Sequence, residues 1–197
     1  MRYETVVIGV SAGGIQALKV ILAALPASFP LAIAIVQHRD ARSDGFLAEY
    51  LNRMSELTVS EAEDKEPLCP GHAYLAPAGY HLLIESDRSF GLSVDARVNH
   101  SCPSVDVLFE SAADAFAESV IGIVLTGANA DGAKGLKAIK ARGGLAIVQN
   151  PKTAEARAMP HAALQAGPVD YVLELDQIPS VLMQLSALRE GIHATNG

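Results

Sequence analysis

The sequence predicts an α/β fold: a doubly wound, mostly parallel sheet with helices on both faces and an antiparallel hairpin extension. Short apolar runs rich in Val and Ile alternate with segments whose apolar residues recur at helical spacing. The strand-like runs are apolar almost without interruption, as expected of parallel strands that helices cover on both sides. With 197 residues, 50% of them hydrophobic, the chain can build one sizeable core, so we expect a single domain over 1–197.

The first half of the chain is predicted to form two strand–helix units. TVVIGV (5–10) and LAIAIVQ (31–37) are apolar runs of strand length, rich in β-branched residues. Segment 14–25 has apolar residues at helical spacing, and it ends before Pro26 because proline cannot continue a helix. A second helix is expected over 44–54.

The middle segment, 57–94, has a different pattern. Its short apolar runs are separated by the turn signals PG, PAG and SDRS. Such spacing is typical of hairpins, so we expect this segment to extend the sheet with antiparallel strands.

The second half returns to alternating helices and strands. Apolar spacing predicts helices over 105–117 and 131–144, with buried strands over 119–127 and 145–149. The chain is expected to finish with a helix over 159–167, a strand over 169–175 and a helix over 177–190.

Charge and cysteine content exclude several classes of protein. The net charge of −7 argues against nucleic-acid binding, because phosphate contacts need clustered Lys and Arg. No apolar stretch has the length of a signal peptide core or a membrane span, so no membrane insertion is expected. Cys69 and Cys102 make no disulfide framework and suit a reducing compartment, which predicts a cytoplasmic location.

Three polar residues of catalytic type follow predicted strands. Ser11 follows the strand over 5–10, His38 follows the strand over 31–37, and Asp131 lies in the loop after the third buried strand. The carboxyl ends of parallel strands share one edge of the sheet, so these distant residues can meet there. Together they are the types needed for a serine nucleophile, its base and the carboxylate that orients the base.

The residues around Ser11 are compatible with this chemistry. Gly9 to Gly13 match the G-x-S-x-G pattern of a nucleophile elbow, between a predicted strand and a predicted helix. Each residue also has a structural explanation: Ser11 as a helix cap, His38 as a hydrogen-bonded strand end, and Asp131 as a turn residue or helix N-cap. Their coincidence at one sheet edge favours a hydrolase.

A nucleotide-binding turn is the competing interpretation of the same glycines. The chain lacks G-x-G-x-x-G, because Ser11 stands where the second glycine is required, and no Gly-Lys-Ser/Thr follows the first strand. His38 stands where an acidic ribose ligand would be expected. His72, His81 and His100 lack the paired spacing of a zinc site, so no metal is expected.

At these residues the chain resembles the catalytic domain of chemotaxis receptor-glutamate methylesterases, the CheB type. GVSAGG (9–14), IVQHR (35–39) and VLTGANADGAKG (124–135) are similar to the three signature blocks of that family. The resemblance continues, in order, through PGHAYLAPAGYHL (70–82), PSVDVLF (103–109) and the segment 147–175, and so covers nearly the whole chain.

The resemblance implies a serine hydrolase that demethylates glutamate methyl esters, and often deamidates glutamines, on bacterial chemoreceptors. It implies Ser11 as nucleophile, His38 as general base and acid, and Asp131 as the orienting carboxylate, with no cofactor. The backbone amides of Ala12 and Ala128 are the expected oxyanion donors. The other residues expected to line the site are Gly9, Gly13, Gly14, Gly127 and Met159.

Three side chains depart from the family pattern. Ala12 stands where many relatives have Thr, Ala128 where they usually have Met, and Asn129 where they often have Gly. A backbone donor survives such changes, whereas substrate contacts made by those side chains do not.

The first predicted strand begins at residue 5, so we expect no N-terminal receiver domain of the kind that family members usually carry. The expected partners are the cytoplasmic helices of methylated chemoreceptors, and a separate receiver protein or a receptor methyltransferase as regulator. The sequence is also compatible with two other functions: a non-catalytic signalling or binding module on the same fold, and a general hydrolase of small esters.

Overall fold

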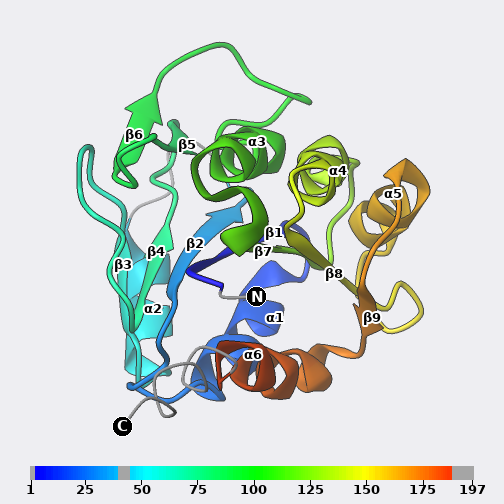
Figure 1. Ribbon diagram of the computed structural model, residues 1–197, viewed down its shortest axis with the longest axis horizontal. Helices are drawn as coiled ribbons and strands as arrows, with labels where there is room; N and C mark the ends of the chain where they lie inside the picture. The colour runs from blue at the N-terminus through cyan, green and yellow to red at the C-terminus, as the bar shows by residue number, and fades with distance from the viewer. Residues whose placement is uncertain (1–2, 40–44, 188–197) are drawn as a thin grey trace, which may run out of the picture.

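A seven-stranded parallel sheet forms the centre of the computed structural model, which describes residues 3–39 and 45–187. The strand order is β3-β4-β2-β1-β7-β8-β9, and every neighbouring pair is parallel. Figure 1 shows the sheet passing through the middle of the molecule. Its strands are β1 (Thr5–Val10), β2 (Ala32–Gln37), β3 (Thr58–Glu61), β4 (His72–Leu75), β7 (Val120–Val124), β8 (Leu145–Gln149) and β9 (Tyr171–Leu173).

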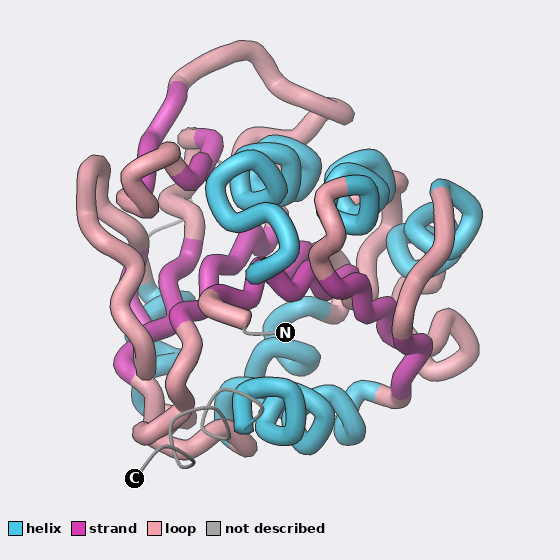
Figure 2. Tube along the Cα trace, viewed as in Figure 1, coloured by secondary structure: helices cyan, strands magenta, loops and turns pink. Residues whose placement is uncertain are grey.

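Helices cover both faces of this sheet, which confirms the predicted doubly wound architecture (Figures 1 and 2). One face packs against α1 (Gly14–Ala23), α2 (Phe46–Arg53) and α6 (Ile178–Ala187). The other packs against α3 (Val105–Phe116), α4 (Ala133–Ala141) and α5 (Ala158–Ala166). Short 3₁₀ turns, η1 (Ala117–Ser119) and η2 (Leu175–Gln177), precede β7 and α6. Parts of the predicted helices 44–54 and 177–190, namely 44 and 188–190, lie outside the described residues.

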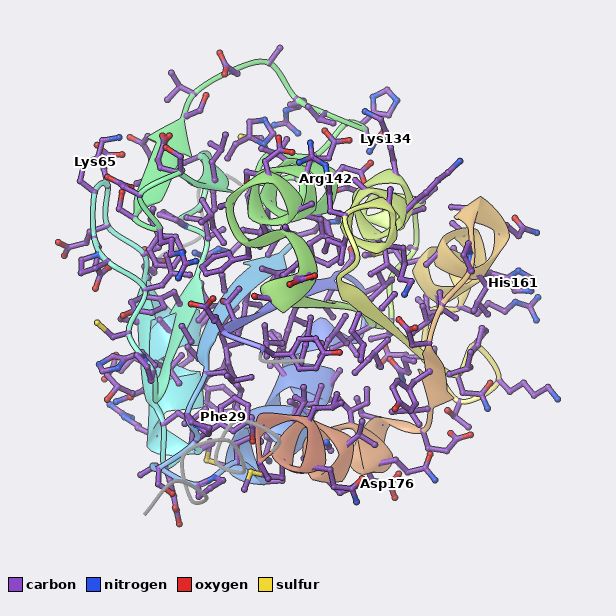
Figure 3. All side chains as sticks on the ribbon, in the orientation of Figure 1. Phe29, Lys65, Lys134, Arg142, His161 and Asp176 are labelled. Carbon is purple, nitrogen blue, oxygen red and sulfur yellow. The ribbon has the colours of Figure 1, made fainter. Side chains whose placement is uncertain are left out.

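Alternating side chains of the central strands build two apolar layers. On β1, Val6 and Ile8 enter the layer beneath α1, whereas Val7 enters the layer beneath α3. All three side chains are fully buried. Figure 3 shows side chains on both sides of the sheet, with Phe29 near α6. Because β1, β2, β7 and β8 are buried on both faces, their sequences are almost continuously apolar, which is the pattern that predicts the fold.

The middle segment divides between two sheets. β5 (His81–Ile84) and β6 (Phe90–Ser93) form a separate antiparallel pair, which confirms the predicted hairpin. β3 and β4 instead join the main sheet as parallel strands. The pair Pro70–Gly71, which predicts a hairpin turn, ends a crossover that returns the chain to the start of β4.

The strand order changes direction beside β1. From β1 the chain proceeds to β2 on one side, and it later resumes at β7 on the other side. The loops that follow β1 and β7 therefore run to opposite faces of the sheet and leave a crevice at the carboxyl ends of these two strands. In open α/β sheets, ligands bind in a crevice of this kind. Across residues 3–39 and 45–187, every helix falls short of the length and hydrophobicity that a membrane-spanning helix needs.

Candidate active site

Ser11 lies in the turn between β1 and α1, and both neighbouring strands hold this turn. The Ser11 N–H donates to the Thr126 carbonyl at 2.9 Å, beyond the end of β7. The Ser11 carbonyl accepts from Gln37 Nε2 at 3.0 Å, at the end of β2, and from the Gly14 N–H at 2.9 Å. The backbone at Ser11 is therefore fixed at the crevice between β1 and β7.

The helix-cap explanation of Ser11 does not hold. The N-cap of α1 is Gly13, in the left-handed region at φ 77°, and no side chain caps the helix. A side chain at Gly13 would be strained and would meet Glu155. Gly127 is close-packed for a different reason, since an added Cβ would lie 2.0 Å from Met159 Sδ and 3.0 Å from Ser11 Cβ.

His38 and Asp131 are joined by a direct hydrogen bond. His38 Nε2 lies 2.8 Å from Asp131 Oδ2, across 93 residues of sequence. The His38 side chain is 11% exposed and the Asp131 side chain is fully buried. The other ring nitrogen, Nδ1, lies 3.4 Å from Nδ2 of Asn129. The carboxylate thus orients the imidazole through Nε2 and leaves Nδ1 for other partners.

Asp131 caps a helix, but a different one from the helix that its position in the sequence suggests. The N-cap of α4 is Gly132, without a side-chain cap. Asp131 instead accepts the first N–H groups of α3, from Val105 at 2.7 Å and Asp106 at 3.2 Å. Ser104 Oγ also donates to it, at 2.8 Å. The positive end of the α3 dipole therefore faces this carboxylate.

These donors outweigh the burial of the Asp131 carboxylate. Burial alone would raise its pKa, but the hydrogen bonds from His38, Asn99, the Val105 N–H and Ser104 together hold the pKa below the ordinary value. Asp131 is therefore ionised at neutral pH, which is the state needed to stabilise a positive imidazolium.

Ser11 and His38 line the same cleft. One cavity, of about 350 Å³, is bounded by both residues and by Arg97, His100 and Asn129. A second cavity, on the α1 side, is bounded by both residues together with Ala12, Gly13, Gly14 and Glu155. Within the described residues no hydrogen bond joins the Ser11 hydroxyl to the His38 ring. Such contacts are often long in a free enzyme and shorten when substrate binds.

The remaining predicted residues border this cleft to different degrees. Ala12 is exposed at the second cavity, and Ala128 is exposed beside Gly127. The N–H groups of Ala12 and Ala128 make no hydrogen bond to another described residue. Met159 is fully buried against Gly127, and Gly9 packs against Val105 beneath the turn.

Several supporting residues are missing from the sequence-based prediction. Thr126 Oγ1 donates to the Ala12 carbonyl at 2.8 Å and accepts from the Ala156 N–H at 2.9 Å. Gln37 holds the Ser11 carbonyl, and Asn99 Nδ2 donates to Asp131 at 2.9 Å. Gln37 and Thr126 do carry a signal, because they are polar residues at strand ends. Asn99 carries none, since it lies in an irregular segment and not at the end of a strand.

Comparison with known proteins identifies the family of this chain. The family model described as CheB methylesterase matches residues 6–182. A Leptospira interrogans protein, provisionally named protein-glutamate methylesterase/protein-glutamine glutaminase, is 52% identical over 94% of this chain and 96% of its own length. A protein-glutamate methylesterase/protein-glutamine glutaminase of Hydrogenovibrio crunogenus is 39% identical over 93% of this chain. The chain spans about half of that longer relative, 49% of its length.

The fold of a solved relative also matches. The crystal structure of the Thermotoga maritima CheB methylesterase catalytic domain superposes with a TM-score of 0.90 at 37% sequence identity. The match covers 94% of this chain and 100% of that one. Because the family model and the fold both cover most of the chain, the protein belongs to the CheB methylesterase family.

Proposed function

We propose that this protein hydrolyses methyl esters of glutamate side chains on chemoreceptors, with Ser11, His38 and Asp131 as its catalytic triad. The observation that carries the proposal is the 2.8 Å hydrogen bond from His38 to Asp131, at a cleft that Ser11 and His38 line together. The names of the relatives supply the substrates, glutamate methyl ester and glutamine.

The reaction proceeds through an acyl-enzyme. Because Nε2 of His38 is bonded to Asp131, Nδ1 takes the proton from Ser11 as Oγ attacks the γ-carbonyl carbon. The carbon–oxygen bond to the methoxy group then breaks, and His38 returns the proton to the departing methanol. Water adds to the acyl-enzyme with His38 again as base, which releases glutamate and restores Ser11. A glutamine substrate passes through the same acyl-enzyme and releases ammonia.

The tetrahedral oxyanion is stabilised by the backbone N–H groups of Ala12 and Ala128. Their lack of a hydrogen-bond partner among the described residues supports this role, since an oxyanion donor must be free when the charge develops. Every proton in the cycle passes between the chain, the substrate and water, so the mechanism requires no cofactor.

Methanol release from a methylated chemoreceptor fragment tests the proposal. We expect release by the wild type and a loss of at least about a thousandfold in Ser11→Ala, because the nucleophile is gone. Ser180→Ala is the control, since Ser180 is exposed on α6 and, among the described residues, its hydroxyl makes one hydrogen bond, to the Gln177 carbonyl. Release by Ser11→Ala at the wild-type rate would overturn the triad.

Labelling with an organophosphonate separates the two other functions. If Ser11 is labelled and p-nitrophenyl esters are hydrolysed without preference for receptor protein, the chain is a general ester hydrolase. If Ser11 does not react with the organophosphonate, the protein is a binding module that holds a modified side chain. Repeating the methanol assay with a phosphorylated receiver protein or a receptor methyltransferase tests the proposed regulators.

A further inference from the structure

We propose that Asn99 is a positioning residue of this site: its side-chain amide holds Asp131 in place and links that carboxylate to the cleft-lining segment 96–104. We call this segment the strap. The inference rests on the proposed role of Asp131 in the triad and concerns a residue that contacts neither the nucleophile nor the base.

The amide of Asn99 bridges two buried carboxylates. Nδ2 donates to Oδ1 of Asp131 at 2.9 Å and to Oδ2 of Asp106 at 2.7 Å. Asp106 is 5% exposed, and its other oxygen accepts the Gly135 N–H at 2.7 Å. One NH₂ group therefore donates a hydrogen bond to each of two neighbouring buried carboxylates. Without Asn99, each carboxylate would lose one hydrogen-bond donor.

Electrostatics shows what this bridge opposes. Burial raises the pKa of Asp106, and the neighbouring charge of Asp131 raises it further. The groups that face this pair from the packed elements are His38, bonded to Asp131, and Glu110, which also raises the pKa of Asp106. Lys134 on α4 is the nearby cation, and it is paired with Glu110 at 2.8 Å. A donor that serves both carboxylates offsets their repulsion.

Asn99 differs from the other Asp131 donors in where it comes from. Ser104 is the N-cap residue where the strap ends, and Val105 and Asp106 are the first residues of α3, so these three donors belong to the framework of the helix. Asn99 belongs to the strap, whose residues Arg97, His100, Ser101 and Cys102 line the cavity beside Ser11 and His38. Asn99 therefore couples the cleft-lining part of the strap to the triad carboxylate.

The strap is anchored so that Asn99 stays over Asp131. His81 on β5 is buried; its Nδ1 accepts the Ser104 N–H and its Nε2 donates to the Ala96 carbonyl, each at 3.2 Å. One imidazole thus holds both ends of the strap. Between them, Val98 and Ser101 exchange backbone hydrogen bonds of 3.1 and 2.8 Å.

The backbone alone offers another reason for an asparagine at this position. Asn99 and His100, with φ of 50° and 65°, are the central residues of a two-residue turn between Val98 and Ser101. Turns with two positive φ values favour Asn, Asp and Gly. Asn99→Gly and Asn99→Asp therefore preserve the turn while removing the amide donor, and so separate the two explanations.

The experiment measures the rate at which an organophosphonate labels Ser11 between pH 5 and pH 9, together with thermal unfolding. Labelling needs the activated nucleophile but no receptor, so a wild type that is labelled without releasing methanol would reject only the proposed substrate. A wild type that is not labelled would overturn both the triad and this inference. Asn52→Asp is the control, because it adds the same charge on α2 and keeps an oxygen for the Val59 N–H.

We expect labelling at pH 7 to slow about tenfold in Asn99→Gly, the loss of one hydrogen bond to a charged group. The loss is larger in Asn99→Asp, which adds a third carboxylate. In both variants the acid limb of the pH profile moves to higher pH, because a less well compensated Asp131 carboxylate holds a proton on the His38 imidazole more strongly. Rates like the wild type, or an equal loss at every pH with an unshifted acid limb, would overturn the inference.

Discussion

Asp131 has both a proposed catalytic role and a structural role in this protein. The same carboxylate orients His38 and closes the first turn of α3, where Ser104 and the Val105 N–H also donate to it. A fully buried charge is tolerated here because donors from several segments converge on it. Replacing it must therefore affect stability as well as turnover.

Asp131→Asn is expected to destabilise the fold at neutral pH by about 2–4 kcal/mol, because a buried charge network loses its acceptor. The native pKa of Asp131 lies below its ordinary value, so its ionised form stabilises the native state. This contribution is complete above the unfolded pKa of about 4 and is lost as the pH falls through the native pKa.

Urea unfolding at pH 7, 5 and 3 measures the difference between wild type and Asp131→Asn. The difference should be constant from pH 7 to 5 and shrink at pH 3. Asp95→Asn is the matched control, since Asp95 is exposed and, within residues 3–39 and 45–187, its carboxylate accepts a hydrogen bond from Ser93 alone. Equal stability of wild type and Asp131→Asn at pH 7 would contradict the argument.

Asn129 bears directly on His38. Its Nδ2 lies 3.4 Å from His38 Nδ1, the nitrogen proposed to accept the serine proton, and its Oδ1 accepts the Asp131 N–H at 3.1 Å. The amide therefore competes with Ser11 for Nδ1. In Asn129→Gly, an organophosphonate should label Ser11 up to about threefold faster than in the wild type. The factor is small because the contact between Asn129 and His38 is long. Slower labelling would instead show that the amide holds the ring in its working orientation.

The residues that sequence reasoning predicts best are those placed by regular elements. Ser11, His38 and Asp131 follow strands, and parallel strands bring their carboxyl ends to one edge of the sheet irrespective of loop conformation. Asn99 could not be predicted in this way, because its partner comes from a different loop. Its position depends on how two irregular segments cross, which no periodicity records.

At the scale of elements, backbone hydrogen bonds join the loop after β7 to the start of α5. The Gly127 N–H donates to the Ala156 carbonyl at 2.8 Å, and the Met159 N–H donates to the Gly127 carbonyl at 3.0 Å. This close approach leaves no room for a side chain at Gly127. The arrangement keeps the loop that carries Ala128 against the Ser11 turn.

Gly127→Ala should cost about 1–3 kcal/mol of stability, the range for overpacking, because its Cβ would collide with Met159 Sδ. It should also lower the rate of methanol release, since the same Cβ presses on Ser11.

The double variant Gly127→Ala/Met159→Ala should lose less stability than the sum of the losses in the two single variants, because removing the thioether makes room for the new Cβ. Strict additivity in thermal or urea unfolding would contradict this. Gly45→Ala is the control, as an added Cβ there meets no atom within 4 Å.

The directions of β3 and β4 show where element prediction fails. Their apolar runs are short, and turn signals near Pro70 and Gly71 favour a hairpin. The segment between them is instead a crossover, so the strands are parallel. A short apolar run carries no signal for direction, whereas the strands and helices with long periodic patterns were predicted to within a few residues.

At the scale of the whole molecule, charge is distributed unevenly around the cleft. The chain carries a net charge of −7, yet Arg97 lines the cavity beside Ser11. Its guanidinium donates to the His100 carbonyl at 3.3 Å and its side chain is exposed. A negative molecule repels acidic partners at long range, so a cation at the cleft matters most for an acidic protein substrate.

Arg97→Ala is therefore expected to raise KM for a methylated receptor fragment about threefold, while kcat/KM for a neutral p-nitrophenyl ester stays unchanged. The effect should fade above about 0.5 M salt, where the Debye length is only a few ångströms. Arg142→Ala removes the same charge from the C-cap of α4, where Arg142 pairs with Asp114 and lines neither cavity beside Ser11. If both variants raise KM equally, net charge rather than the position of Arg97 governs the encounter. If Arg97→Ala alone does so and the difference disappears in salt, the strap contacts an acidic surface beside the ester.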